Sequence, residues 1–513
     1  MNLSKILLIL NTVKYLKFKQ IYFRLFYFLR FRYRKLIGFK YPFSKNSKSN
    51  NLVLIDSISS YESYHNGGFN FLNLSKSFDN IDWNFSEYGK LWTYNITYFD
   101  FLNQSNFQKE IGIKLIYDFI DKSDVIRDGF EPFPISLRGI NWIKFLTYNN
   151  IQDKKIDDCL YAQYDILIDS LEYHLLGNHL LENGFSLLFG AYYFEDDKLY
   201  LKAKEILSYE LKEQILKDGG HFELSPMYHQ IMLFRTLDSI NLVENSSFKE
   251  DTLLNTLRTS AELMLSWLKN ISYENGDIPL FSDSANNIAP NSKLLFDYAK
   301  SLELNVKEIE LSDSGYRKIL KDNYEMIVDV GSVGAEYIAG HAHADTFNFE
   351  LQIEGKPFIV DSGLSTYEIN NSRFFERGTS AHNTVEVLGK NSSEVWGGFR
   401  VANRARVIEI DEKKNLIKAT HNGYKKDAVL HTRIWVFEDS KIIIEDKLSK
   451  ETDAISRLHF HPDITEKMIE KHIISLEKFC IKSYKYADGF NKLIDAKYIE
   501  AKFNSKLILE VKI

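Results

Sequence analysis

The sequence predicts an α+β protein of several domains, with an N-terminal (α/α) toroid followed by a C-terminal antiparallel β-sandwich. At 513 residues the chain is too long for one ordinary hydrophobic core, so two or three domains are expected. From about residue 106 to 305 the apolar residues recur with a helical period. Beyond residue 320 the segments become short, β-branched and alternating, which is typical of antiparallel strands.

The composition indicates a globular protein and gives no sign of a nucleic-acid partner. Hydrophobic residues make up 44% of the chain and there are only 8 prolines, which argues against a disordered chain. A net charge of −6 gives no reason to expect nucleic-acid binding. Two cysteines, Cys159 and Cys480, fall in different predicted domains, so they indicate neither a disulfide framework nor a cysteine-based metal site.

Residues 1–80 are predicted to contain a basic, aromatic helix and an irregular linker. The apolar run 6–10 is shorter than a signal-peptide core and has no small-residue cleavage site after it, so a cytoplasmic location is expected. Residues 14–35 mix aromatic with basic residues, which allows two interpretations. The helix lies peripherally on an anionic membrane, or its aromatic face packs on the next domain. The polar stretch 42–80 is interpreted as loops.

Residues 81–310 carry the predicted helices of the toroid. Ser136 is placed to cap a helix that contains Arg138 and Trp142. No repeat of fixed period is detectable, which argues against a simple solenoid. The other predicted helices cover residues 107–122, 153–174, 178–194, 198–216, 226–243, 250–270 and 291–302.

Residues 311–513 form the predicted β-sandwich. Glu354-Gly355 and residues 438–440 sit where hairpin turns belong, and antiparallel hairpins of this kind build a sandwich. The predicted strands cover residues 323–330, 346–353, 356–360, 383–388, 404–410, 414–420, 428–437 and 441–447.

Two polar clusters lie at predicted helix starts in the toroid. Asn178, His179 and Glu182 fall on the first turn of one helix, because positions i, i+3 and i+4 share a face. Asn178 taken alone is also explained as an N-cap. The second cluster is the loop 218–226, which leads into a helix with Tyr228 in its first turn. Polar residues crowded at a helix start commonly face a cleft, although a buried, hydrogen-bonded tyrosine is the alternative for Tyr228.

A third cluster contains His341, His343 and Asp345, which alternate with alanines just before a predicted strand. In an extended backbone these three side chains point to the same side. His343 combines with Asp361 and His382, on later segments, into a set of two nitrogen ligands and one oxygen ligand that suits Zn²⁺. The spacing alone does not identify a metal site.

Together these motifs resemble those of heparinase II/III-type polysaccharide lyases and the related oligoalginate lyases. The resemblance covers roughly residues 90 to 450. It implies a cleft between toroid and sandwich, and cleavage of a uronic-acid-containing glycan by β-elimination, in bacterial capsule, O-antigen or exopolysaccharide metabolism. Heparan sulfate itself is not implied. The motifs that carry the resemblance are Asn178 to Asn183, Gly220 to His229, Gly340 to Asp345, Asp361 to Gly363 and Ala381 to Thr384.

The resemblance also implies roles for individual residues. Asn178 and His179 would bind the uronate carboxylate, with Glu182 orienting His179. Tyr228 would serve as base, acid or both, and His341 as the complementary proton carrier.

The implied zinc ion, held by His343, Asp361 and His382, would fix the loops of the β-domain into the cleft. Asp345 would then be a structural partner and not a ligand. The substrate contacts that the resemblance implies are Arg138, Trp142, Tyr367 and Arg377.

Two other functions stay open from the sequence. Toroids of this class also host the paired carboxylates of glycoside hydrolases, and Asp218, Glu182 and Glu223 are available for that role. A non-catalytic glycan-binding scaffold in polysaccharide assembly is the other. For the lyase, the expected partner is an acidic polysaccharide or oligosaccharide.

Overall fold

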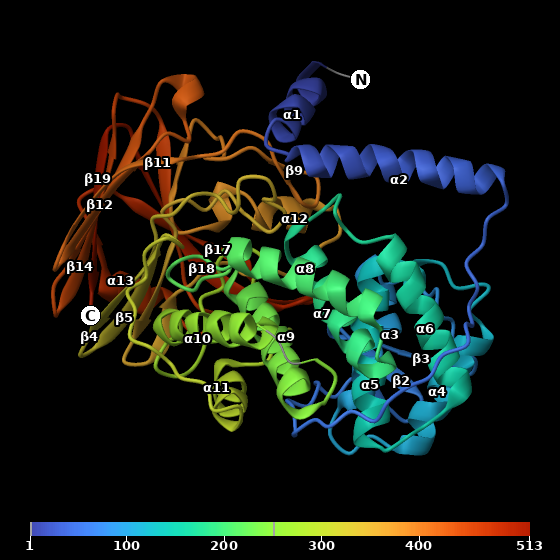
Figure 1. Cartoon of the computed structure of the whole chain (residues 1–513). Coiled ribbons are helices and arrows are strands. Elements are labelled where there is room, and N and C mark those ends of the chain that lie inside the picture. Colours follow the sequence, from blue (N-terminus) through green and yellow to red (C-terminus); the bar gives the residue numbers. More distant parts are fainter. Residues whose placement is uncertain (1–2, 250–251) are drawn as a thin grey trace.

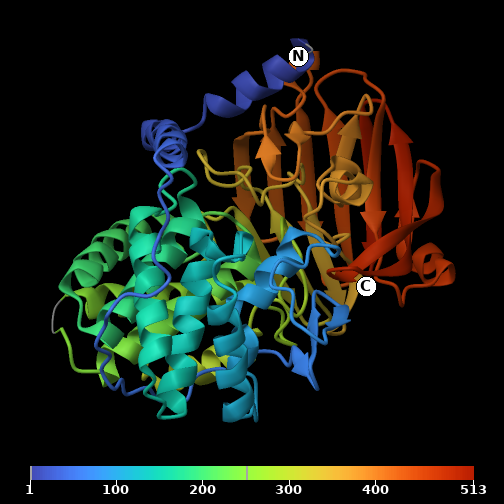
Figure 2. The same ribbon diagram turned by 90° about the vertical axis from the view of Figure 1, so that its right-hand side faces the viewer.

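The computed structural model describes residues 3–249 and 252–513, and it places a helical domain beside a domain of β-sheets (Figures 1 and 2). The helices come first in the chain and the antiparallel sheets follow them. The predicted α+β fold class is therefore confirmed. No helix among the described residues has the length and apolar character needed to cross a bilayer.

The N-terminal region contains two helices and a small sheet. The helices α1 (Leu3–Val13) and α2 (Phe18–Leu36) lie along one side of the molecule (Figure 1). The prediction of loops for 42–80 is wrong at residues 64–77, where β1 (Tyr64–His65), β2 (Gly68–Phe71) and β3 (Leu74–Ser77) form an antiparallel sheet. Two tight turns of residues with positive φ, 66–67 and 72–73, join these short strands.

The helical domain is built around α7, which is almost entirely buried and is apolar beyond its first turns. It packs against α5, α8 and α9. Gly190 in α7 permits close contact with α6, because a Cβ there would lie 2.6 Å from the ring of Tyr164. The predicted helix 250–270 begins on residues 250–251, which lie outside the described residues. The helices are α3 (Lys90–Tyr98), α4 (Lys109–Asp121), α5 (Pro132–Tyr148), α6 (Lys154–Asp169), α7 (Gly177–Phe194), α8 (Asp197–Gln214), α9 (Pro226–Asn245), α10 (Leu253–Ile271) and α11 (Ser292–Ser301).

The β-domain contains three larger antiparallel sheets that share a hydrophobic core. One is β4 (Tyr316–Lys321), β5 (Tyr324–Asp329), β6 (Phe349–Ile353) and β7 (Lys356–Ile359). The second has the order β11 (Val407–Lys413), β12 (Leu416–His421), β13 (His431–Phe437), β14 (Lys441–Leu448), β19 (Lys506–Lys512) and β16 (Ile473–Ser475). The third has the order β17 (Phe479–Gly489), β18 (Lys492–Phe503), β15 (Ala454–His459) and β8 (Val385–Val387). Shorter elements are β9 (Val395–Trp396), β10 (Arg400–Val401), α12 (Asn371–Glu376) and α13 (Glu466–His472). Sequence analysis did not predict the five strands after residue 450.

The segment that carries His341, His343 and Asp345 is a loop in front of β6. The strand begins at Phe349, not at residue 346, because Phe347 has a φ of 71° that interrupts the extended backbone. The loop therefore lies between the β-domain and the helical domain, and its backbone accepts a hydrogen bond from the Asp283 N–H at the His341 carbonyl (3.0 Å).

Candidate active site

A cavity of about 500 Å³ lies between the two domains. The helices α3, α5, α7 and α9, the segment 58–73 and residues 286–294 supply its lining, and Tyr367 and Phe490 reach it from the β-domain. Asn178, Glu182, Tyr228 and Tyr367, all predicted site residues, line it. The cavity is therefore the place where the sequence motifs of both domains meet.

Tyr228 is held at the start of α9 by its local sequence. Ser225 caps the helix, its Oγ accepting from the Tyr228 N–H at 3.2 Å, and Pro226 occupies the first helical position. The same Oγ donates to the carbonyl of Asp283 at 2.8 Å. The Tyr228 hydroxyl lies 3.1 Å from that of Tyr367. The cap thus places the phenol in the cavity and ties it to the loop that carries Asp283.

His341 stacks on Tyr228 across the domain boundary, with ring centroids 3.8 Å apart and 29° between the planes. Its Nδ1 lies 2.9 Å from the Asp283 carboxylate. Its Nε2 lies 3.4 Å from the side-chain nitrogen of Asn178 and 3.5 Å from the carboxylate of Glu223. An ionised carboxylate only accepts, so the closer contact with Asp283 favours a proton on Nδ1, and in the neutral ring Nε2 is then the acceptor.

Asp283 organises the β-domain side of the site. Its two oxygens accept from His341, from His343 Nε2 at 2.8 Å and from both terminal nitrogens of Arg373, one of them at 2.8 Å. Burial alone would raise the pKa of this carboxyl, but Arg373 and the two histidines hold it well below its usual range. Sequence analysis did not single out Asp283 as a site residue. A single signal was available, which is a dense polar run directly after apolar residues.

The first turn of α7 holds Asn178 and His179 as predicted, but the partner of His179 differs. His179 Nδ1 lies 3.0 Å from the carboxylate of Glu172. Glu182, predicted to orient His179, instead accepts from Arg235 Nε at 3.1 Å. The side chain of Glu182 lies one turn further along α7, beside α9, whereas Glu172 precedes the helix and turns back towards its start.

The pKa of His179 is raised by this arrangement. Burial by itself would lower it, but the charge and hydrogen bond of Glu172 outweigh the burial. The side chain of His179 is about one-third exposed (34%) and its ring packs 4.6 Å from that of Phe133, which lines the cavity. The imidazole at the edge of the cavity therefore holds a proton more readily than a free histidine does.

Burial raises the pKa of Tyr228, and the nearby Asp283 and Glu223 raise it further, whereas Tyr367 and Arg373 oppose the shift. The phenol is therefore neutral and available as a proton donor. The role of base, which the resemblance left open for Tyr228, suits Nε2 of His341 better.

The three predicted zinc ligands form a buried cluster. His382 Nδ1 lies 2.7 Å from Asp361, and the rings of His343 and His382 are 5.3 Å apart. His343 Nδ1 and His382 Nε2 are buried without a hydrogen-bond partner. Histidines that bind metals commonly direct their other nitrogen at a carboxylate, as His343 does here through Asp283.

The donor atoms of this cluster are of the types that bind zinc, but they are not arranged as a complete set of ligands around one ion. Within the described residues, no group of three or more His, Cys, Asp or Glu side chains is placed to hold an ion. Asp361 Oδ2 also accepts from Asn348, and Oδ1 accepts from the Gly363 N–H at 3.0 Å. Asp361 would therefore have to turn from these donors to become the third ligand.

Three predicted substrate contacts are wrong, because the residues are buried in the protein. Arg138 is fully buried and donates to the carbonyls of Thr97 and Gly129 and to Gln163. Trp142 is 0% exposed and packs edge-on against Phe99 and Phe119. Arg377 is 1% exposed and donates to the carbonyls of Ala342 and residues 397–398. Each serves packing or loop structure.

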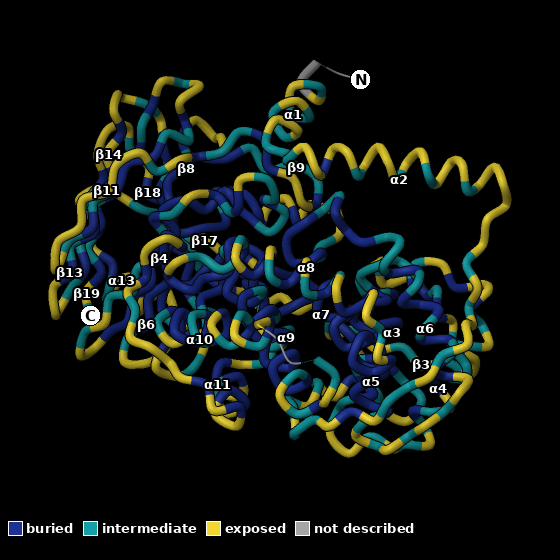
Figure 3. The backbone as a smooth tube through the Cα atoms, viewed as in Figure 1, coloured by how far each residue is buried: buried dark blue, intermediate teal, exposed yellow. Residues whose placement is uncertain are grey.

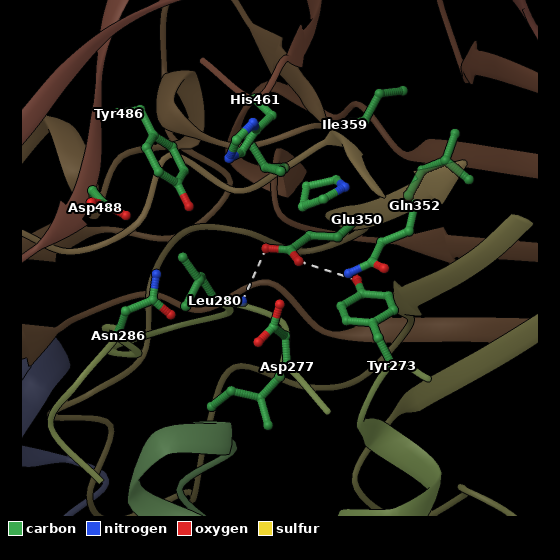
Figure 4. A pocket seen from close by; sticks show the side chains of 14 residues that line it. Tyr273, Asp277, Leu280, Asn286, Glu350, Gln352, Ile359, His461, Tyr486 and Asp488 are labelled. Atoms are coloured by element: carbon green, nitrogen blue, oxygen red, sulfur yellow. Dashed lines mark hydrogen bonds between the residues drawn. The ribbon is translucent and has the colours of Figure 1, made fainter. Parts of the chain in front are cut away.

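A second cavity, of about 120 Å³, lies between the domains and contains none of the predicted site residues (Figure 4). Glu350 of β6 accepts there from the Tyr273 hydroxyl at 3.1 Å and the Leu280 N–H at 3.0 Å. Burial, and then the charge of Asp361, raise the pKa of Glu350 to about 8. These contacts join the two domains behind the candidate site.

Both domains match protein families that are already known. Residues 139–305 match the heparinase II/III N-terminus, and residues 306–486 match the heparinase II/III-like C-terminal domain. The heparin-sulfate lyase of Bacteroides stercoris is 24% identical over 316 residues, which cover 56% of this chain and 46% of that protein. The heparin-sulfate lyase of Pedobacter heparinus is 25% identical over 304 residues, which cover 54% of this chain and 44% of that protein. The chain thus spans about half the length of the curated relatives it matches.

Solved structures share the fold at low sequence identity. The match to a crystal structure of heparinase III has a TM-score of 0.66 at 16% sequence identity. It covers 91% of this chain and 87% of the heparinase III chain. The crystal structure of the heparan sulfate lyase of Pedobacter heparinus matches with a TM-score of 0.54 at 16% sequence identity. This match covers 87% of this chain and 81% of that chain. The arrangement of helical and sheet domains is therefore common to these proteins.

Proposed function

Because the chain belongs to the heparinase II/III family, we propose that it is a polysaccharide lyase that cleaves a uronic-acid-containing glycan by β-elimination. The observation that carries the proposal is the stack of His341 on Tyr228 between the domains. It brings an acceptor nitrogen and a neutral hydroxyl to one place at the edge of a cavity. β-Elimination needs both groups, since one proton leaves C5 and another is added to the departing oxygen.

Nε2 of His341 is the proposed base. It takes the proton from C5, the electrons of the broken C–H bond form the C4–C5 double bond, and the C4–O bond breaks. The imidazolium formed is stabilised by Asp283 at Nδ1 and by Glu223, 3.5 Å from Nε2.

Tyr228 is the proposed acid, giving its hydroxyl proton to the departing 4-oxygen. Its raised pKa keeps the hydroxyl of Tyr228 protonated until the C4–O bond breaks. The hydroxyl of Tyr367, 3.1 Å away, supplies a hydrogen bond that supports the phenolate left behind.

Asn178 and His179 are proposed to bind the uronate carboxylate. The C5 proton is acidic enough to remove only if the carboxylate charge is neutralised. The amide of Asn178 supplies hydrogen-bond donors, and the raised pKa of His179 supplies a cation. When Asn178 turns to the substrate, Nε2 of His341 becomes free to accept a proton.

We also propose that His343, Asp361 and His382 hold a zinc ion that joins the loops of the β-domain. The two unpartnered buried ring nitrogens support this. The ion would act as a cross-link that holds the loop of His341 against the helical domain. Elemental analysis of protein purified without added metal tests it, with about one zinc per chain expected and none expected for His382→Ala. A folded, active protein without metal would refute the site.

The lyase proposal is tested by screening defined uronate-containing glycans for products with the ultraviolet absorbance of an unsaturated sugar. Bacterial capsular, O-antigen and exopolysaccharides belong in the screen beside heparan sulfate. We expect Tyr228→Phe and His341→Ala to lower turnover by about 10²–10⁴-fold. Tyr209→Phe, at an exposed tyrosine of α8, is the matched control and should not change it.

The other functions predict different results in the same screen. New reducing ends without ultraviolet absorbance would indicate a hydrolase. Of its candidate carboxylates only Glu182 lines the cavity, and Asp218 is held by the backbone of residues 312 and 314. Glycan binding without any product would indicate a scaffold. Turnover that survives Tyr228→Phe and His341→Ala together would refute the mechanism.

A further inference from the structure

The helix α2 is attached to the helical domain by one narrow stripe of side chains. Gln20 Nε2 donates to the carbonyl of Leu175 at 2.9 Å, and the ring of Phe23 stacks on Tyr173 with centroids 4.7 Å apart. Further along, Tyr27, Arg30 and Arg34 bond residues 169–171. These five positions are spaced three and four residues apart, so they occupy a single face of the helix.

The opposite face of α2 is apolar and exposed. Its large side chains are Phe18 (80% exposed), Tyr22 (51%), Leu25 (58%), Leu29 (56%) and Leu36 (85%). They repeat with the same spacing as the attached stripe but about half a turn away from it. Figure 3 shows α2 exposed along most of its length. We call these five residues the outer stripe.

The charge around the outer stripe has one sign. The first 55 residues contain 12 lysines and arginines and no aspartate or glutamate, although the whole chain has a net charge of −6. Arg24, Arg32 and Lys35 of α2 are exposed beside the outer stripe. The surface therefore suits a partner that is both anionic and able to accept large apolar side chains.

An anionic lipid bilayer meets both conditions, and we propose that α2 docks this protein onto one. A helix with an apolar face and flanking cations lies in the interface of a membrane, with its apolar side chains among the lipids and its cations at the headgroups. Leu7 and Leu10 of α1, the helix that precedes α2, are also exposed, at 51% and 60%. The attached stripe holds the protein body against the other side of the helix.

Two other occupants fit the surface less well. A second copy of α2 would bring like charges together, because the helix carries no acidic residue. An acidic glycan would pair with the cations but would leave the outer stripe in water. Both are distinguished from a bilayer by experiment.

The test is flotation of the full-length protein with vesicles of phosphatidylcholine alone and with about one-third phosphatidylglycerol. We expect binding to the anionic vesicles only, weakened by salt. Leu25→Ser/Leu29→Ser should lower the bound fraction at least about tenfold. Leu201→Ser, at an α8 leucine that is 66% exposed, is the matched control and should bind like the parent. Arg32→Glu/Lys35→Glu should lower binding by about fivefold for each cation removed.

Absence of binding to anionic vesicles, or equal binding by the parent and Leu25→Ser/Leu29→Ser, would overturn the proposal. So would dimerisation in light scattering that Leu25→Ser/Leu29→Ser abolishes, which would assign the stripe to a second copy. Binding of an acidic polysaccharide that requires Arg32 and Lys35 but not Leu25 and Leu29, without vesicle binding, would assign the surface to a glycan. None of these outcomes depends on lyase activity.

Discussion

Replacement of Asp283 by asparagine tests whether this carboxylate sets the protonation of His341. The carboxylate accepts from His341 at 2.9 Å, from His343 at 2.8 Å and from Arg373 at 2.8 Å. An amide has a single acceptor oxygen, and its NH₂ group would donate to Nδ1 of His341. The proton would then move to Nε2, which could no longer accept one from the substrate.

The expected loss in turnover is about 10³–10⁴-fold. In the Ser-His-Asp triad, the corresponding Asp→Asn change puts the imidazole in the wrong tautomer and costs about 10⁴-fold. Stability should fall as well, because Arg373 is 0% exposed and would keep its charge without a counter-charge. Loss of one partner of a buried ion pair costs about 3–5 kcal/mol.

The assay measures the initial rate of ultraviolet absorbance and the midpoint of unfolding for the same preparations. Asp283→Asn combined with Arg373→Met separates the two effects. Removing the unpaired charge should recover part of the stability, whereas turnover should stay low because the tautomer stays wrong. If Asp283→Asn is folded and turns over within about tenfold of the parent, the assigned role of Asp283 is refuted.

Three further predictions follow from contacts elsewhere in the molecule. Glu172→Gln removes the charge that raises the pKa of His179, so the alkaline limb of kcat/KM should move to lower pH, and an unmoved limb would contradict the role of His179. Arg138→Leu should lower the unfolding midpoint, because it leaves buried carbonyls without donors, and should leave KM unchanged; a raised KM would restore Arg138 as a substrate contact. Asp446, whose pKa is held low against burial by Arg433, stabilises the fold above the usual carboxyl pKa and loses this effect as pH falls. Asp446→Asn should therefore cost about 3–5 kcal/mol near neutral pH and less in acid, measured by denaturant unfolding, and an equal loss at both pH values would argue against ion pairing.

The sequence by itself determined the order of the two domains, most helices of the first domain and the main catalytic candidates. Helical periodicity placed α7 and α9 within two residues of their observed ends, and alternation placed β5 and β14 equally well. These signals are local, since they arise from one face of each element being buried. The resemblance of the motifs around Tyr228 and His341 to those of the lyase family also implied that these two residues act together.

Only the tertiary structure decided which side chains meet. Asp283 joins His341 and Arg373 because two loops and the helix α12, all distant in sequence, converge, and no local period reports such a meeting. Glu172 takes the place predicted for Glu182 because the chain before α7 folds back on the start of the helix.

Burial was likewise decided in three dimensions. Arg138 and Trp142 have residue types that are common in glycan sites, yet neighbouring helices cover both completely. For α2 the sequence allowed either packing or membrane contact, since aromatic residues occur all round the helix. The structure shows that the stripe from Gln20 to Arg34 contacts the helical domain, because a single helix presents one face to the domain beside it.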